Sequence, residues 1–124
     1  MTVTVSIDHH DAIRLLREVV KGKEDFIYIS ERGRCFYTKG DCPSCLIGYA
    51  LVRGGVPIEM VKLLDNNSIS SEDADAIPMI IKGVTQEAAH VFNAAQVVQD
   101  DDHTWGEALD AAEDYYREHY GTTS

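Results

Sequence analysis

The chain has 124 residues, a net charge of −10 and 44% hydrophobic residues, an ordinary globular composition that excludes disorder as its main state. It has no run of 18 apolar residues, so we expect no membrane-spanning helix and no membrane partner. The N-terminus lacks the pattern of a secretory signal, and three cysteines suit a reducing cytoplasm. We therefore expect a single globular domain over residues 1–124, in the cytoplasm.

The charge is unevenly distributed along the chain. Residues 1–62 hold nine Lys and Arg against eight Asp and Glu, whereas residues 63–124 hold two against thirteen. The second half therefore carries −11, which predicts an electrically polarised molecule. Such a field repels phosphate backbones, so direct nucleic-acid binding is disfavoured. The acidic half is either a solvated face or a surface that docks a basic partner.

The N-terminal segment predicts a strand followed by a helix. Residues 3–7 alternate apolar and polar side chains, as a half-buried strand does. Asp8 is suited to the N-cap of an amphipathic helix that continues to Lys21, and Gly22 supplies its stop.

The next segment predicts a β-hairpin. Residues 26–29 and 34–38 are rich in aromatic and β-branched residues, and Gly33 lies in the turn between them. Arg32 and Arg34 make this hairpin the basic part of the molecule.

The middle of the chain predicts short helices separated by turns. Pro43 fits the first turn of a helix over residues 44–52, and a second helix is expected over 58–64. Residues 65–75 are polar and predict a loop. Residues 78–81 form a short apolar stretch, for which we expect an extended conformation.

Two longer helices are expected in the C-terminal half. The first follows Thr85 and runs to about Gln99, and its apolar residues lie nearly all the way round. Such a helix is either central in the domain or part of a homodimer interface. The second follows a capping box of Thr104 and Glu107 and runs to about Tyr120, antiparallel to the first. Together the patterns predict a mostly helical α+β fold, with four to five helices around a small antiparallel hairpin or sheet.

The cysteines raise the question of a metal or redox site. Cys42 and Cys45 have the spacing of a zinc knuckle, and Cys35 lies seven residues upstream. A fourth ligand would have to be a distant histidine, such as His9, His10 or His90. Thiol redox chemistry near a helix N-terminus is a further alternative, although the surrounding βαβ unit is missing. The simpler interpretation is structural cysteines without metal or cofactor.

Other candidate groups predict no catalysis. His9 and His10 are adjacent on a helix and therefore point about 100° apart, so we expect helix-start polar residues and no shared site. Residues 100–102 lack the spacing of a calcium loop. The sequence contains no nucleophile elbow, phosphate-binding glycine loop or zinc-protease motif. We therefore expect a protein that is not an enzyme.

Two stretches carry a family resemblance. The first comprises residues 43–51 (PSCLIGYAL) and 53–57 (RGGVP), and the second comprises 94–100 (AAQVVQD) and 104–113 (TWGEALDAAE). They resemble a family of small proteins from actinobacteria and their phages, including mycobacteriophages. The resemblance implies a phage or actinobacterial origin and a bacterial cytoplasmic setting. That family has no assigned activity, so it supplies no functional residues.

The leading hypothesis is a non-enzymatic protein-binding module that acts on a host or phage protein, as phage accessory proteins often do. The residues proposed for contact are an acidic helix face and two hairpin cations: Glu107, Asp110, Asp114, Glu118, Arg32 and Arg34. The alternatives are a small structural zinc-binding domain around Cys35, Cys42 and Cys45, and an acidic DNA-mimic regulator.

Overall fold

The computed structural model describes residues 5–27, 37–39, 42–43, 45–66, 77–101 and 103–120. Six helices hold about 70% of these residues. They are α1 (His9–Val20), α2 (Leu46–Arg53), α3 (Ile58–Asn66), α4 (Ile77–Ile80), α5 (Gln86–Asp100) and α6 (Trp105–Tyr120). Two segments of two residues each, β1 (Thr38–Lys39) and β2 (Cys42–Pro43), pair in antiparallel fashion.

The predicted α+β class is wrong, because no sheet layer exists among the residues that the structure describes. The β1–β2 ladder is a two-residue contact and covers no helix face. The described ends of the predicted hairpin also pair elsewhere, since Ile27 bridges Thr104 and Thr38 bridges Pro43. Residues 28–36, which include the predicted turn, lie outside the described ranges.

The segment before residue 28 serves as a partner for the start of α6. The first N–H groups of a helix have no acceptor within the helix. Here the Phe26 carbonyl accepts from the Trp105 N–H at 2.8 Å, and the Glu24 carbonyl accepts from the Gly106 N–H at 2.9 Å. This segment therefore uses its carbonyl groups to cap a helix, which is the physical reason that its described part forms no hairpin.

Three other predicted segments also differ from the structure. Of the strand expected over 3–7, residues 3–4 lie outside the described ranges and only Ile7 pairs, in a parallel bridge with Val84. Pro43 belongs to β2 and not to a helix, and α2 begins at Leu46. The stretch expected to be extended at 78–81 lies mostly in α4.

The helix ends with clear capping residues are confirmed. At α1 the Asp8 side chain accepts from the Asp11 N–H at 2.9 Å, and the Asp11 side chain accepts from the Asp8 N–H at 3.2 Å. Thr104 and Glu107 form the equivalent reciprocal box at α6, with distances of 3.1 and 3.0 Å. Gly22 follows α1 with a φ of 83°, a conformation that favours glycine.

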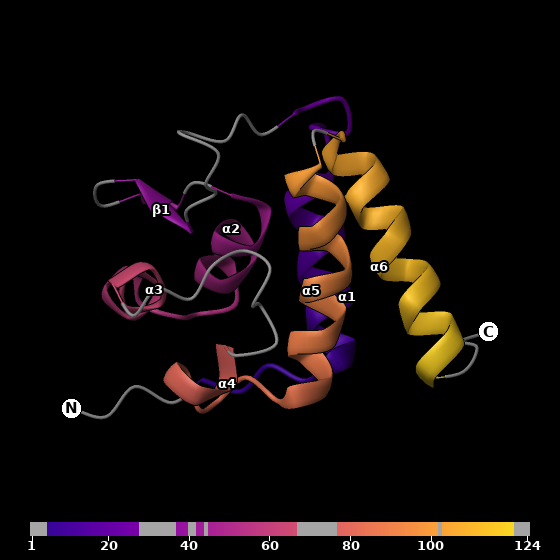
Figure 1. Cartoon of the computed structure of the whole chain (residues 1–124). Coiled ribbons are helices and arrows are strands. Elements are labelled where there is room, and N and C mark those ends of the chain that lie inside the picture. The colour runs from indigo at the N-terminus through magenta and orange to yellow at the C-terminus, as the bar shows by residue number, and fades with distance from the viewer. Residues whose placement is uncertain are drawn as a thin grey trace.

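The longest helices lie side by side (Figure 1). α1 and α5 run in the same direction (Figure 1), and each follows one side of the parallel bridge between Ile7 and Val84. α6 returns antiparallel to α5 and contacts both α5 and α1. The shorter α2 and α3 lie on the other side of α5, and α4 lies near its N-terminal end (Figure 1).

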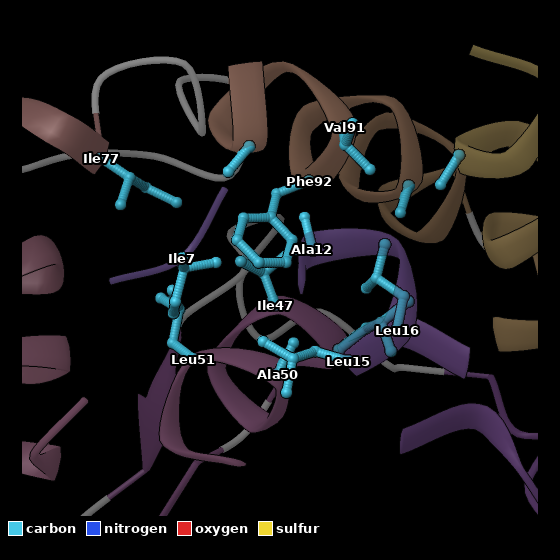
Figure 2. Packing of buried hydrophobic residues seen from close by; sticks show 14 of the residues in the cluster. Ile7, Ala12, Leu15, Leu16, Ile47, Ala50, Leu51, Ile77, Val91 and Phe92 are labelled. Carbon is cyan, nitrogen blue, oxygen red and sulfur yellow. The ribbon is translucent and has the colours of Figure 1, made fainter. Parts of the chain in front are cut away.

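The hydrophobic core lies where α1, α2 and α5 meet. Phe92 extends from α5 towards Ile47 of α2, with Ala12 of α1 beside it (Figure 2). All three side chains are fully buried, and the same buried cluster includes side chains from each of the six helices. Most of the apolar residues of α5 are thus buried within the chain, as expected of a central helix, whereas Val97 on the same helix is 52% exposed.

Candidate binding site

The predicted acidic face forms a stripe along α6. Glu107, Asp110, Asp114 and Glu118 are all exposed. Glu107 is engaged locally, because hydrogen bonds from the Thr104 N–H and hydroxyl lower the pKa of its carboxyl group. Asp114 forms an ion pair with Arg117. The carboxylates of Asp110 and Glu118 have no ion-pair partner among the described residues, so the free charge of this acidic stripe rests on these two.

The other predicted contact and metal residues are only partly described. Arg32, Arg34 and Cys35 lie outside the described ranges, and the side chain of Cys42 is likewise not described. Within the described ranges, no group of three metal-ligating side chains occurs. Cys45 is buried at the N-cap of α2, where its sulfur accepts from the Gly48 N–H at 3.5 Å.

His9 and His10 come together, contrary to the expectation from helix geometry. Their ring centroids are 4.2 Å apart, because both rings turn towards the C-terminal end of α6. His9 stacks on Tyr120 at 4.3 Å, and His10 Nδ1 lies 2.5 Å from the Tyr116 hydroxyl. Burial raises the pKa of Tyr120. This cluster fixes the end of α6 against the start of α1, so its evident role is structural.

A groove lies at the opposite end of these helices, where α1 ends and α6 begins. A cavity of ≈ 450 Å³ opens there. Its lining comes from the turn after α1, from α2 and from the first residue of α6: Gly22, Lys23, Glu24, Asp25, Phe26, Tyr49 and Trp105. The turn after α1 lies beside the start of α6 at the top of Figure 1. The hydrogen bonds that cap α6 hold this part of the lining in place.

Three aromatic rings form the apolar wall of the groove. The centroid of the Phe26 ring lies 4.5 Å from that of the Trp105 ring, and the centroid of the Tyr49 ring lies 5.8 Å from it in an edge-on arrangement. Phe26 is 47% exposed and Tyr49 is 36% exposed, whereas Trp105 is 1% exposed. Two large aromatic side chains therefore remain open to solvent around a buried third.

The indole N–H of Trp105 has no hydrogen-bond acceptor among the residues that the structure describes. Its Nε1 is one of two buried side-chain polar atoms without a partner in the described part of the chain, the other being Asn93 Oδ1. Buried donors are nearly always paired, because an unpaired donor costs about 1–3 kcal/mol. The Nε1 atom itself is buried, although Trp105 contributes to the lining of the groove.

The sequence indicated the parts of this groove but not the groove itself. The sequence predicts Trp105 at the start of the last helix, Tyr49 within the helix over 44–52 and Phe26 in a strand of the hairpin. Their meeting depends on the docking of residues 22–27 against α6, which is a long-range contact. The signal for the groove is the exposure of Phe26 and Tyr49 beside the single tryptophan, and this exposure is known only from the folded structure.

In comparisons with protein families, curated proteins and solved structures, the chain matches none. No helix in the described ranges has the length and apolar character needed to cross a bilayer. The function must therefore be inferred from the groove and the acidic stripe.

Proposed function

We propose that this protein is a non-enzymatic binding module, and that the groove around Tyr49 and Trp105 is where a partner protein docks. The observation that carries this proposal is the pair of exposed aromatic side chains, Phe26 and Tyr49, which line the groove on either side of the buried Trp105 ring. The partner is a host or phage protein, in keeping with the actinobacterial and phage resemblance of the sequence. The setting that we propose is the bacterial cytoplasm.

The groove has the composition of an interface centre. Aromatic residues are enriched at binding hot spots, where they fill pockets and exclude water. Phe26 and Tyr49 are large aromatic side chains, 47% and 36% exposed, that line the same cavity. Exposed apolar side chains that gather beside a cavity indicate an interaction surface more than single exposed residues do. A partner that covers them gains hydrophobic burial.

The groove's chemistry favours binding over catalysis. Its described lining combines aromatic rings with Lys23, Glu24 and Asp25 at the rim. An activated nucleophile needs an adjacent base within hydrogen-bond reach, and no such pair occurs among these lining residues. The acidic stripe of α6 is a second proposed contact, suited to a basic segment of the same partner.

Affinity capture from an actinobacterial lysate, with quantitative mass spectrometry, tests the docking face. Four baits are compared: wild type, Tyr49→Glu in the groove, the double variant Asp110→Lys/Glu118→Lys in the stripe, and Met79→Glu. Met79 lies on α4 and is 77% exposed, so it is a matched control for an added surface charge.

We expect wild type and Met79→Glu to capture the same partner in similar amounts. Tyr49→Glu should capture at least tenfold less of it. Loss with the stripe variant in addition would place the acidic stripe in the same interface. Capture that is unchanged by Tyr49→Glu, with circular dichroism showing a folded bait, would refute the groove as the docking face.

A further inference from the structure

A cluster of histidine and tyrosine rings joins the start of α1 to the end of α6, which lie at the same end of the bundle (Figure 1). It contains four of the five histidines of the chain. Histidine is the side chain that gains charge between about pH 8 and 5. The members of this histidine–tyrosine cluster are His9, His10, His90, Tyr115, Tyr116, His119 and Tyr120.

Two side chains of α1 hold the last turns of α6. His9 stacks on Tyr120 with ring centroids 4.3 Å apart, and His10 Nδ1 lies 2.5 Å from the Tyr116 hydroxyl. Tyr116 is buried in this contact. Tyr120 also donates from its hydroxyl to the Glu87 carbonyl at the start of α5, at 3.4 Å. The end of α6 is therefore attached to α1 mainly through two groups that can take up protons.

His9 and His10 are close enough to repel each other when both are charged. Their ring centroids are 4.2 Å apart, and a like charge at such a distance opposes protonation of the second group. Both residues stand in the first turn of α1. The positive end of the helix dipole lies there and also disfavours added positive charge.

The surrounding charges compensate for one proton on this pair, not for two. The Asp8 carboxylate interacts electrostatically with both imidazoles, and the C-terminal end of the α6 dipole favours a cation. The other charged neighbours at helical spacing or in contact are Asp11 and Arg14 on α1, Glu113 and Arg117 on α6, and Glu87 on α5. The first four are each in an ion pair of their own.

His90 and His119 are the further titratable groups of the cluster. His119 stacks on Tyr115 at 4.0 Å, and the His90 ring lies 6.4 Å from the same tyrosine. Protons on these two imidazoles add positive charge to the cluster and do not relieve the repulsion between His9 and His10.

We propose that the histidine–tyrosine cluster is a pH-sensitive latch, which holds the end of α6 on α1 while at most one of His9 and His10 is protonated and loosens when both are. In the loosened state the two rings are apart and in water, so this state takes up the second proton more readily. Because it binds more protons, the latched state loses stability as the pH falls through the range in which imidazole titrates. Helix ends open at small cost, so a modest repulsion is enough to shift this equilibrium.

Ionisation of Asp8 does not account for a change in this range. The hydrogen bond from the Asp11 N–H lowers the pKa of Asp8 below its ordinary value of 3.8, so its carboxylate stays charged at pH 5.5. A change between pH 7.5 and pH 5.5 therefore reports on the imidazoles.

Amide hydrogen exchange of the full chain at pH 7.5 and pH 5.5 tests the latch. Exchange is followed by mass spectrometry, and each rate is divided by the intrinsic chemical rate at the same pH. We expect the protection of residues 115–120 to fall about threefold to fivefold at pH 5.5, as befits the repulsion of a partly exposed charge pair. Protection of residues 106–111 on the same helix should stay constant. High salt should reduce the loss, because it screens the repulsion.

Variants assign the effect to the pair. His9→Phe keeps an aromatic ring on Tyr120 but takes up no proton, so its protection of residues 115–120 should be the same at both pH values. His10→Asn removes the same repulsion and serves if His9→Phe does not fold, as judged by circular dichroism. His103→Phe is the matched control, since His103 lies before α6 and contacts Asp101 and Glu107. It should keep the wild-type dependence on pH.

Three results would overturn the latch. They are equal protection of residues 115–120 at both pH values in wild type, an undiminished loss in His9→Phe and His10→Asn, and an equal loss along the whole of α6, which would indicate general loosening by acid. The measurement does not involve the groove, so the latch and the docking face stand or fall separately.

Discussion

Two buried amides of α5 support the start of α2. Gln96 and Gln99 are both 0% exposed. The Gln99 side-chain oxygen accepts from the Leu46 N–H at 2.8 Å, and Gln96 exchanges weak hydrogen bonds with the Cys45 sulfur. Since the first N–H groups of a helix lack internal acceptors, α5 supplies what α2 cannot.

Replacing Gln99 by leucine should therefore destabilise the protein. Gln99→Leu leaves the Leu46 N–H buried without an acceptor, and such a loss costs about 1–3 kcal/mol. Chemical denaturation followed by circular dichroism measures the change in unfolding free energy. Val97→Ala is the control, because Val97 lies on the same helix and is 52% exposed; its effect should stay within about 0.5 kcal/mol. An equal effect of both variants would contradict the role of Gln99.

Gly48 is required by a close backbone approach. A Cβ at this position would lie 2.1 Å from the Tyr37 carbonyl oxygen, whereas at Gly106 it would lie 3.0 Å from the Glu24 oxygen. Alanine is the better helix former by about 1 kcal/mol, so an unhindered Gly48→Ala would be stabilising. We expect instead a loss of about 1–3 kcal/mol from the clash, and a smaller loss for Gly106→Ala. Thermal melts of both variants check the order, and a more stable Gly48→Ala would refute the contact.

At the scale of single elements, the cap of α1 makes stability depend on pH. The hydrogen bond from the Asp11 N–H lowers the pKa of Asp8 below its ordinary value of 3.8. A lowered pKa means that the folded state prefers the carboxylate. The resulting stability is complete above the ordinary pKa and is lost as the pH falls through the lower pKa of the folded state.

Asp8→Ala should thus cost about 1 kcal/mol at neutral pH, and this difference from wild type should shrink as the pH falls below about 4. Asp8→Asn is the control, since asparagine caps helices as well as aspartate but does not titrate. Denaturation curves between neutral and acidic pH give both differences. A cost of Asp8→Ala that is constant with pH would show that the carboxylate charge is not involved.

Elements with local signals were the ones that the sequence could predict. The first, fifth and sixth helices each carry an N-cap residue, Asp8, Thr85 or Thr104, whose side chain bonds within the next turn, and their starts are confirmed. The conformation of segments without such signals depends on contacts with residues that are distant in the sequence. Ile27 has strand-forming character, but the unpaired N–H groups of α6 determine its neighbours.

The same distinction applies to the candidate site. Helical periodicity predicts that the stripe residues share one face of the last helix. The structure shows that all four are exposed: Glu107, Asp110, Asp114 and Glu118. The groove joins the turn after α1, the middle of α2 and the start of α6. No periodicity within a single element encodes that meeting, because it depends on how three elements pack.

At the scale of the whole molecule, the two differently charged halves of the sequence do not form two separate bodies. α1 comes from the nearly neutral half, yet it packs against α5 and α6 of the acidic half. Arg17 of α1 pairs with Glu113 of α6 at 2.7 Å, which joins the halves directly. The predicted polarity therefore becomes a local pattern, in which an acidic stripe on α6 contrasts with the lysines beside the groove.

The packing of α5 also bears on the oligomeric state. An all-round apolar helix fits a homodimer interface as well as a central helix. Here α1, α2, α4 and α6 all contact α5, and Val91, Phe92 and Ala95 are each 0% exposed. A single chain already buries these three residues, and Val97 is the one large apolar side chain of α5 that is left mostly exposed, at 52%.

We therefore expect a monomer of 13.8 kDa in size-exclusion chromatography with light scattering. A dimer mass would contradict this and would direct attention to the exposed aromatic groove. In that case Tyr49→Glu should restore the monomer mass and Met79→Glu should not. The groove would then be a self-association surface, because a second copy of the chain would compete with any partner for Phe26 and Tyr49.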